Sequence, residues 1–290
     1  MTSIIIGSAF YPADGDGGRR QERARAALRA LPDAMPVNLQ FTDDTFAPDG
    51  FLTLPVLRLD SRTVTGSGGR RKPIVSEMLD ALAAAARKTG CRYFAYLNAD
   101  IEATPAALEY IHARGRDGYA FCRVDVDPDT RESLGIQPYG IDMVAFEVGW
   151  WTRARRRFRP YIAGEACWDN VYAALICSLG RGDIVSHQPL IFHERHPTAW
   201  QTHDDPYAQY NGYLAALDAP YFSRWVDYVH AVKDAKESEP EHDRTIARVF
   251  EASMTPLERI THAGRQVRAR WRYSRLRRRS AHARRIRSGS

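Results

Sequence analysis

Residues 2 to 115 alternate between short apolar runs and segments with helical spacing, and this order constrains the fold more than any other feature of the chain. The apolar runs are TSIIIGSAF (2–10), PVNLQFTDD (36–44), GFLTLPVLRLD (50–60) and CRYFAYLN (91–98). Helical spacing occurs in RRQERARAALRAL (19–31), PIVSEMLDALAAAARKTG (73–90) and TPAALEYIHARG (104–115). This alternation predicts an α/β fold with a mostly parallel central sheet flanked by helices.

The second half of the chain follows a different order. We expect strands in residues 119–127 and 138–151, a helix over 164–180, and a strand over 183–196 that ends in two histidines. Residues 204–260 are predicted to be helical and polar. The resulting expectation is a main domain over 1–203, a helical extension packed on it over 204–262, and an Arg-rich tail over 263–290. The Gly-, Ser- and Arg-rich segment 61–72 is predicted to be an exposed loop.

Composition limits the class of protein. The chain has 290 residues, 44% of them hydrophobic and 26% charged, as in soluble globular proteins. It has no apolar run near the ~20 residues that span a bilayer. Its four cysteines lack metal-site or disulfide spacing, so we expect free thiols and a cytoplasmic protein.

The positive charge is concentrated at the C-terminus. Eleven arginines and no acid occur between residues 265 and 287, and removing them from the net charge of +6 leaves the rest of the chain at about −5. With Trp271, Tyr273 and Leu276 among them, these arginines favour an interfacial helix on the anionic inner face of the membrane. The alternatives are a solvated terminus or a nucleic-acid contact.

Polar side chains follow several of the predicted strands. In a parallel sheet, ligands bind beyond the carboxyl ends of the strands. The residues expected at that edge are Ser8, Asp43, Asp44, Asp60, Asn98 and Asp100.

The order of four motifs carries a resemblance. These are Asn98-Ala99-Asp100 after a strand, Gly140-Ile141-Asp142 in a later strand, the Gly-Glu-x-x-Trp-Asp segment 164–169, and a histidine after the apolar run PLIF. In this order, over residues 1–200, the chain resembles the GT-A glycosyltransferases, particularly family-2-like members. The resemblance implies transfer of a sugar from a nucleotide-diphosphate donor to a glycan or lipid-linked acceptor. It also implies a divalent cation, Mn²⁺ or Mg²⁺, because a diphosphate leaving group needs its charge neutralised.

The resemblance assigns the metal to the strand-end motif. Such enzymes typically carry Asp-x-Asp there, so Asp100 is the expected ligand, with Glu102 a weaker one. Asn98 departs from the pattern and is expected to contact the donor ribose or a metal-bound water. His193 and His196 are expected to complete the metal shell or to contact the diphosphate. A turn that only caps the following helix is the structural alternative.

The segment 163–170 is expected to lie near the acceptor. A general base there would deprotonate the attacking hydroxyl, and Glu165 and Asp169, four residues apart, would share one helix face. We favour Asp169 as the base and Glu165 as a ligand of acceptor hydroxyls, although the family pattern does not decide between them. Trp168 is expected to stack on a sugar ring or to lie in the core.

The remaining candidates concern the donor. Ser8 and Ala9 are expected against the ribose or base, and Asp43 or Asp44 at a base N–H group. Arg71 and Lys72 are expected to neutralise phosphate charge. Asp142 is expected to hold the donor sugar.

Other classes fit less well. The chain lacks a G-x-G-x-x-G turn after its first strand and a P-loop. A nucleic-acid groove should not contain as many acids as the predicted cleft does. A non-catalytic, degenerate transferase or a binding protein that works through its basic tail is the alternative to an enzyme.

Overall fold

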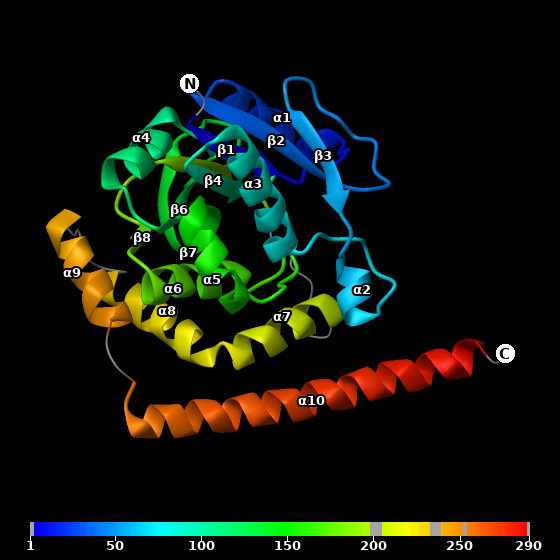
Figure 1. The fold of residues 1–290 in the computed structure, drawn as a ribbon. Coiled ribbons are helices and arrows are strands. Elements are labelled where there is room, and N and C mark those ends of the chain that lie inside the picture. Colours follow the sequence, from blue (N-terminus) through cyan, green and yellow to red (C-terminus); the bar gives the residue numbers. More distant parts are fainter. Residues whose placement is uncertain (1–2, 198–204, 233–238, 252–253, 289–290) are drawn as a thin grey trace.

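The structure is a computed structural model that describes residues 3–197, 205–232, 239–251 and 254–288. In this part of the chain nine strands form one sheet in the order β3-β2-β1-β4-β7-β6-β9-β5, with β8 paired to β6 (Figure 1). The strands are β1 (Ile4–Ser8), β2 (Ala34–Phe41), β3 (Leu52–Leu57), β4 (Tyr93–Leu97), β5 (Ile101–Ala103), β6 (Gly118–Val126), β7 (Ser133–Glu147), β8 (Gly182–Val185) and β9 (Ile191–Glu194).

Helices cover both faces of the sheet and continue to the C-terminus. They are α1 (Gly15–Arg29), α2 (Ser61–Thr65), α3 (Val75–Thr89), α4 (Pro105–Arg114), α5 (Val148–Ala154), the 3-10 turn η1 (Arg155–Arg157), α6 (Trp168–Leu179), α7 (Pro206–Leu217), α8 (Ala219–Val232), α9 (Glu239–Phe250) and α10 (Pro256–Ser288). The pairs β1–β2, β1–β4, β2–β3, β6–β8 and β6–β9 are parallel, and β4–β7, β5–β9 and β6–β7 are antiparallel. The predicted α/β class, with a mostly parallel sheet flanked by helices and a helical C-terminal extension, is therefore confirmed.

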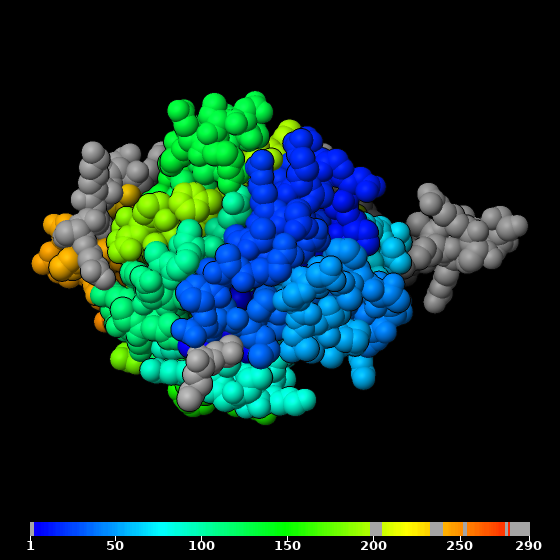
Figure 2. Space-filling model, turned by 90° about the horizontal axis from the view of Figure 1, so that it is seen from above, coloured from blue at the N-terminus to red at the C-terminus, as the bar shows by residue number. Residues whose placement is uncertain are grey.

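Two apolar cores lie on the two faces of the sheet. Ile4 and Ile6 point to the side covered by α1 and α4, whereas Ile5 points to the side covered by α3 and α6. The same alternation separates Tyr93 from Phe94 in β4, because successive side chains of a strand face opposite ways. Strands buried on both faces explain the continuous apolar runs in the sequence. Seen from above, much of the surface belongs to the blue and light-blue N-terminal segments (Figure 2).

Four local predictions were wrong. The strand expected over 138–151 ends at Glu147, and residues 148–151 begin the helix α5. Segment 61–72 is not all loop, because the Asp60 side chain accepts the Thr63 N–H and caps α2, which ends at the left-handed Gly66. Segment 183–196 forms two strands, β8 and β9, and both pair with β6. The helix expected over 164–180 begins only at Trp168.

The C-terminal helices form a layer beside the sheet domain. α8 packs on α6, and α10 lies along α7 and α8 (Figure 1). The Tyr273 ring stacks on Tyr213 with 4.2 Å between centroids, and the Gln266 amide donates to the Leu217 carbonyl. α10 runs without a break through the predicted boundary at residues 262 and 263. No helix in the described ranges is both long and apolar enough to cross a bilayer. All four cysteines are free thiols.

Candidate active site

A short antiparallel strand pair brings the strand-end motif to the late histidines. β4 ends at Leu97, the chain turns through Asn98 to Asp100, and β5 then pairs with β9 so that Ile101 lies opposite His193. β9 also pairs with β6, which places His193 beside Asp125. The sheet therefore positions residues from β4, β6 and β9 around one point at its edge.

Asp100, His193 and His196 converge there. Oδ2 of Asp100 lies 3.2 Å from Nε2 of His196 and 3.7 Å from Nε2 of His193, and the two Nε2 atoms are 3.2 Å apart. These three side chains can each offer one ligand atom to a metal ion. His193 is buried, and the other two side chains are half-buried.

The outer nitrogen of each histidine fixes which atom faces the cluster. Nδ1 of His193 lies 3.0 Å from an Asp125 carboxylate oxygen, and Nδ1 of His196 lies 2.9 Å from the Pro197 carbonyl oxygen. Because both partners can only accept, each Nδ1 carries its proton, and a neutral ring then presents a lone pair at Nε2. Two such lone pairs and a carboxylate oxygen face one another. Such a set is stable only around a cation or an added proton.

The donor set fits a divalent cation. Oxygen ligands are preferred by Mg²⁺, while imidazole nitrogens suit borderline transition metals. Two imidazoles with one carboxylate therefore suit a transition-metal cation better than Mg²⁺. The Asp125 contact behind His193 is the kind of outer partner that orients metal-binding histidines.

Protonation of the cluster follows from the same contacts. Burial alone raises the pKa of Asp100, but hydrogen bonds from His193 and His196 outweigh it and hold the pKa well below its usual range. The hydrogen bond to Asp100 raises the pKa of His196. Protons therefore compete with a metal for His196 as the pH falls.

A chain of polar contacts runs from this cluster across β6 and β7 to Asn98. Asp125 accepts from Arg123 Nε at 2.9 Å, and Arg123 Nη1 donates to Asp142 at 2.7 Å. The other Asp142 oxygen accepts from the Asn98 amide at 2.5 Å, and the Tyr96 hydroxyl donates to the Asn98 oxygen at 3.1 Å. Asn98 and Asp142, both expected to contact the donor, are thus hydrogen-bonded to other side chains of the protein, and these bonds fix their orientation.

Asp169 experiences the charge of Asp142, a member of this chain of contacts. It occupies the first turn of α6 and is half-buried. Burial and the charge of Asp142 raise its pKa to about 7, although Arg123 and backbone N–H groups oppose the shift. A carboxyl with a pKa near neutrality can exchange a proton with a hydroxyl group.

Glu165 occupies a position other than the one expected, and Trp168 occupies one of its two expected positions. Glu165 precedes α6, and the chain then turns through Cys167 in the left-handed region (φ 79°), so the shared helix face with Asp169 does not exist. Glu165 is buried and accepts from Lys72 Nζ at 2.6 Å. The Trp168 ring is 2% exposed, between Tyr96 and Tyr172. It therefore takes the second of its two expected places, the core.

The residues near β1 and β2 that were expected to bind the donor differ in whether they already have a partner within the protein. Arg71 makes two hydrogen bonds to Asp43, at 2.8 and 2.5 Å, and its guanidinium lies 3.6 Å from the centroid of the Phe41 ring. The bond from Arg71 lowers the pKa of Asp43. Asp44 is exposed and Ala9 half-buried. The buried Ser8 hydroxyl, at the end of β1, has no hydrogen-bond partner in the described part of the chain.

Several charged residues of the site were not predicted from the sequence. Arg123 and Asp125 are two apart on β6, a spacing that puts them on one face and could have indicated a pair. Arg20 of α1 lies 4.0 Å from the buried Glu194, and its charge opposes protonation of His196. Arg23 also pairs with Glu194. The sequence feature that could have pointed to Arg20 and Arg23 is the Gly-rich segment that precedes Arg19 and Arg20 at the start of α1.

No protein-family model matches the chain, and no curated protein matches it. Among solved structures, S. aureus TarS 1-349 in complex with UDP-GlcNAc is 10% identical, with a TM-score of 0.46, over 93% of this chain and 79% of that one. The mannosyltransferase PcManGT from Pyrobaculum calidifontis, in complex with GDP-Man and Mn2+, is 11% identical, with a TM-score of 0.39, over 97% and 80%. These likenesses are distant, so substrate and mechanism are inferred from the chain's own residues.

Proposed function

We propose that the protein is a glycosyltransferase that moves a sugar from a nucleotide-diphosphate donor to a hydroxyl group of a glycan or lipid-linked acceptor, with the help of a divalent cation. One observation carries the proposal. Hydrogen bonds link the three-ligand cluster through Asp125 and Arg123 to Asp142, and the charge of Asp142 helps to raise the pKa of Asp169 to about 7.

The two ends of this arrangement suit the two halves of the reaction. Asp100, His193 and His196 would hold the cation, which when bound supplies positive charge to a diphosphate leaving group. Arg20, close to the same cluster, adds a fixed positive charge. These groups serve the breaking bond between the sugar and the diphosphate.

Asp169 serves the bond that forms. In its ionised form it accepts the proton of the acceptor hydroxyl while that oxygen attacks the sugar. The Asn98–Asp142–Arg123 contacts keep a second carboxylate beside Asp169, and the charge of Asp142 raises the basicity of Asp169. Ser8, at the end of β1, is proposed as a donor contact, because its buried hydroxyl has no hydrogen-bond partner among the described residues.

The proposal includes a location for the protein in the cell. The basic helix α10 is proposed to contact the anionic inner face of the membrane, with the protein in the cytoplasm. Nucleic acid is not a proposed partner, because the cleft presents several carboxylates.

A second candidate function is nucleotide binding without transfer. The Lys72–Glu165 pair favours it, because Glu165, which was expected to bind acceptor hydroxyls, is buried and already accepts from Lys72. A thermal-shift screen of UDP, GDP and dTDP with and without Mn²⁺ tests donor binding in either case, since a ligand of the folded state stabilises it. Turnover of UDP-, GDP- or dTDP-sugars with Mn²⁺ separates the two. Binding without release of nucleoside diphosphate would support the second candidate.

A further inference from the structure

A groove lies between α10 and the pair α7–α8. Figure 1 shows α10 running along these two helices. Its volume is about 530 Å³. The floor is largely apolar and is formed by Ala215, Ala216, Ala219 and Phe222. A groove of this size and lining fits a hydrocarbon segment.

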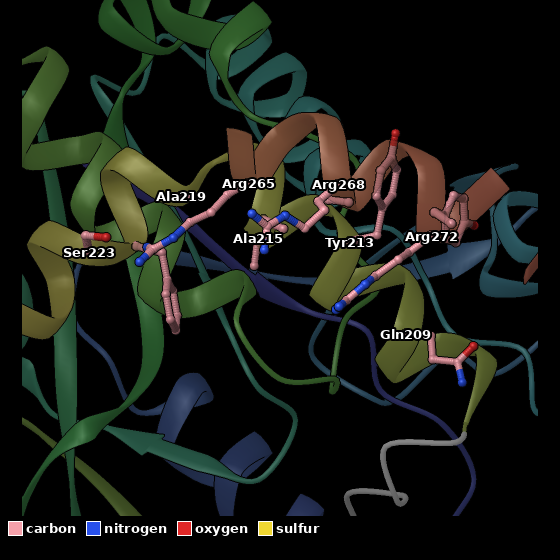
Figure 3. A pocket seen from close by; sticks show the side chains of 12 residues that line it. Gln209, Tyr213, Ala215, Ala219, Ser223, Arg265, Arg268 and Arg272 are labelled. Atoms are coloured by element: carbon pink, nitrogen blue, oxygen red, sulfur yellow. The ribbon is translucent and has the colours of Figure 1, made fainter. Parts of the chain in front are cut away.

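Three arginines of α10 line the same groove. Arg265, Arg268 and Arg272 are three and four residues apart and so share one side of the helix. Figure 3 shows their side chains extending from α10 beside α7 and α8. All three are exposed, and no carboxylate in the described ranges pairs with any of them. Among the described residues, the positive charge over the apolar floor therefore has no carboxylate counter-ion.

α10 also keeps an apolar stripe in solvent. Leu257, Ile260, Val267 and Trp271 are exposed by 73%, 71%, 66% and 55%, and their spacing places them on one side of the helix. The opposite side packs on the protein through Gln266 and Tyr273. A helix with one face docked and one apolar, Arg-flanked face free has the pattern of helices that lie in a membrane interface.

We propose that this groove binds an anionic membrane lipid, with the headgroup phosphate on Arg265, Arg268 and Arg272 and the first part of one hydrocarbon chain against the α7–α8 floor. Guanidinium groups bind phosphate through charge-assisted hydrogen bonds. A nucleic acid would offer phosphate but no hydrocarbon for the floor. The inference rests on the proposed function only for the approach of α10 to an anionic surface and not for sugar transfer.

The test uses the full chain and two ligand forms. One is vesicles of phosphatidylcholine with and without phosphatidylglycerol, measured by flotation. The other is dihexanoyl phosphatidic acid below its micelle concentration, measured by calorimetry, with inorganic phosphate and a single-stranded oligonucleotide as comparisons. The groove variant is Arg265→Gln/Arg268→Gln/Arg272→Gln. The matched control, Arg259→Gln/Arg270→Gln/Arg278→Gln, removes the same charge from exposed positions of α10 outside the groove.

We expect the groove variant to lose binding of the short-chain lipid and at least about tenfold in partitioning to anionic vesicles, with a smaller loss in the control. A second pair of variants distinguishes loss of the groove from misfolding of the protein. Ala216→Glu places a carboxylate in the groove and should also weaken lipid binding, whereas Ala263→Glu, exposed and outside the groove, should not.

Three results would overturn the inference: equal losses in the groove and control variants, inorganic phosphate binding as tightly as the lipid, or loss of oligonucleotide binding alone. Because nucleotide binding and sugar turnover are measured in solution without lipid, failure of the groove leaves the proposed transferase function untouched.

Discussion

Oδ2 of Asp100 lies 3.2 Å from Nε2 of His196, although the two residues are 96 positions apart in the chain. The contact joins the turn after β4 to the segment after β9, and His193 completes the group. Since both histidines present Nε2 to the carboxylate, the cluster has the character of a cation site.

Removing Asp100 should abolish metal-dependent donor binding. In Asp100→Ala we expect Mn²⁺-dependent affinity for a nucleoside diphosphate to fall by at least about a hundredfold, because even outer partners of metal ligands contribute about 10- to 100-fold. Titration calorimetry with Mn²⁺ and with EDTA measures this. The matched control is Glu102→Gln, whose carboxylate pairs with Arg131 at 2.6 Å and should be dispensable for the metal. Unchanged affinity in Asp100→Ala would remove Asp100 from the site.

Asp125 should act through His193. In Asp125→Asn the carboxylate that orients Nδ1 is lost, so we expect metal affinity to fall about 10- to 100-fold while affinity for the metal-free nucleotide stays the same. Mn²⁺ titration followed by electron paramagnetic resonance reports free metal directly. Asp129→Asn, exposed and four residues away, is the control. A loss of nucleotide binding in EDTA would instead indicate general damage to the cleft.

Asp169 should set the pH dependence of transfer. A general base must be ionised, and burial raises its pKa to about 7, so kcat/KM should rise with pH and reach half its maximum near pH 7. Saturating Mn²⁺ is needed, because protonation of His196 also weakens metal binding at low pH. Asp169→Asn should lose about 10²- to 10⁴-fold in rate, keep donor affinity and lose the rising limb. A pH profile identical to that of the parent protein in Asp169→Asn would assign the limb to another group.

The Lys72–Glu165 pair should be structural. Lys72→Met leaves the buried Glu165 carboxylate without its cation, and we expect a loss of about 3 kcal/mol in the free energy of unfolding. The double variant Lys72→Met/Glu165→Met should recover most of this loss, because neither charge then remains buried. Urea unfolding of the two single variants and the double variant measures the coupling. Additive losses would show that the pair contributes no mutual stabilisation.

Much of the fold was predictable because its first half is locally consistent. Apolar runs such as CRYFAYLN and helices such as α3, which is rich in Ala and Leu and has Gly90 as its C-cap, each favour a single structure, and their alternation predicts the parallel sheet. The strand-end rule then placed Asp100 at the edge of the sheet. Local pattern was sufficient for these features.

The rest of the site depends on pairings between distant segments. The antiparallel pairing of β5 with β9 places His193 near Asp100, and no short-range pattern specifies it. Arg123 and Asp142 meet across β6 and β7 through an irregular register. The predicted helix face shared by Glu165 and Asp169 does not form, because Cys167 adopts a left-handed backbone conformation. That conformation is uncommon for a residue other than glycine, so the sequence did not indicate it.

One measurement tests the central proposal most directly: release of nucleoside diphosphate from UDP-, GDP- and dTDP-sugars by the purified protein, with Mn²⁺ and with EDTA, alongside Asp100→Ala and Asp169→Asn. The account predicts release by the parent protein from at least one donor with Mn²⁺ only, none by Asp100→Ala, and metal-dependent donor binding without turnover by Asp169→Asn. Absence of donor binding and release with Mn²⁺ across these sugars, or equal release in EDTA, would contradict it.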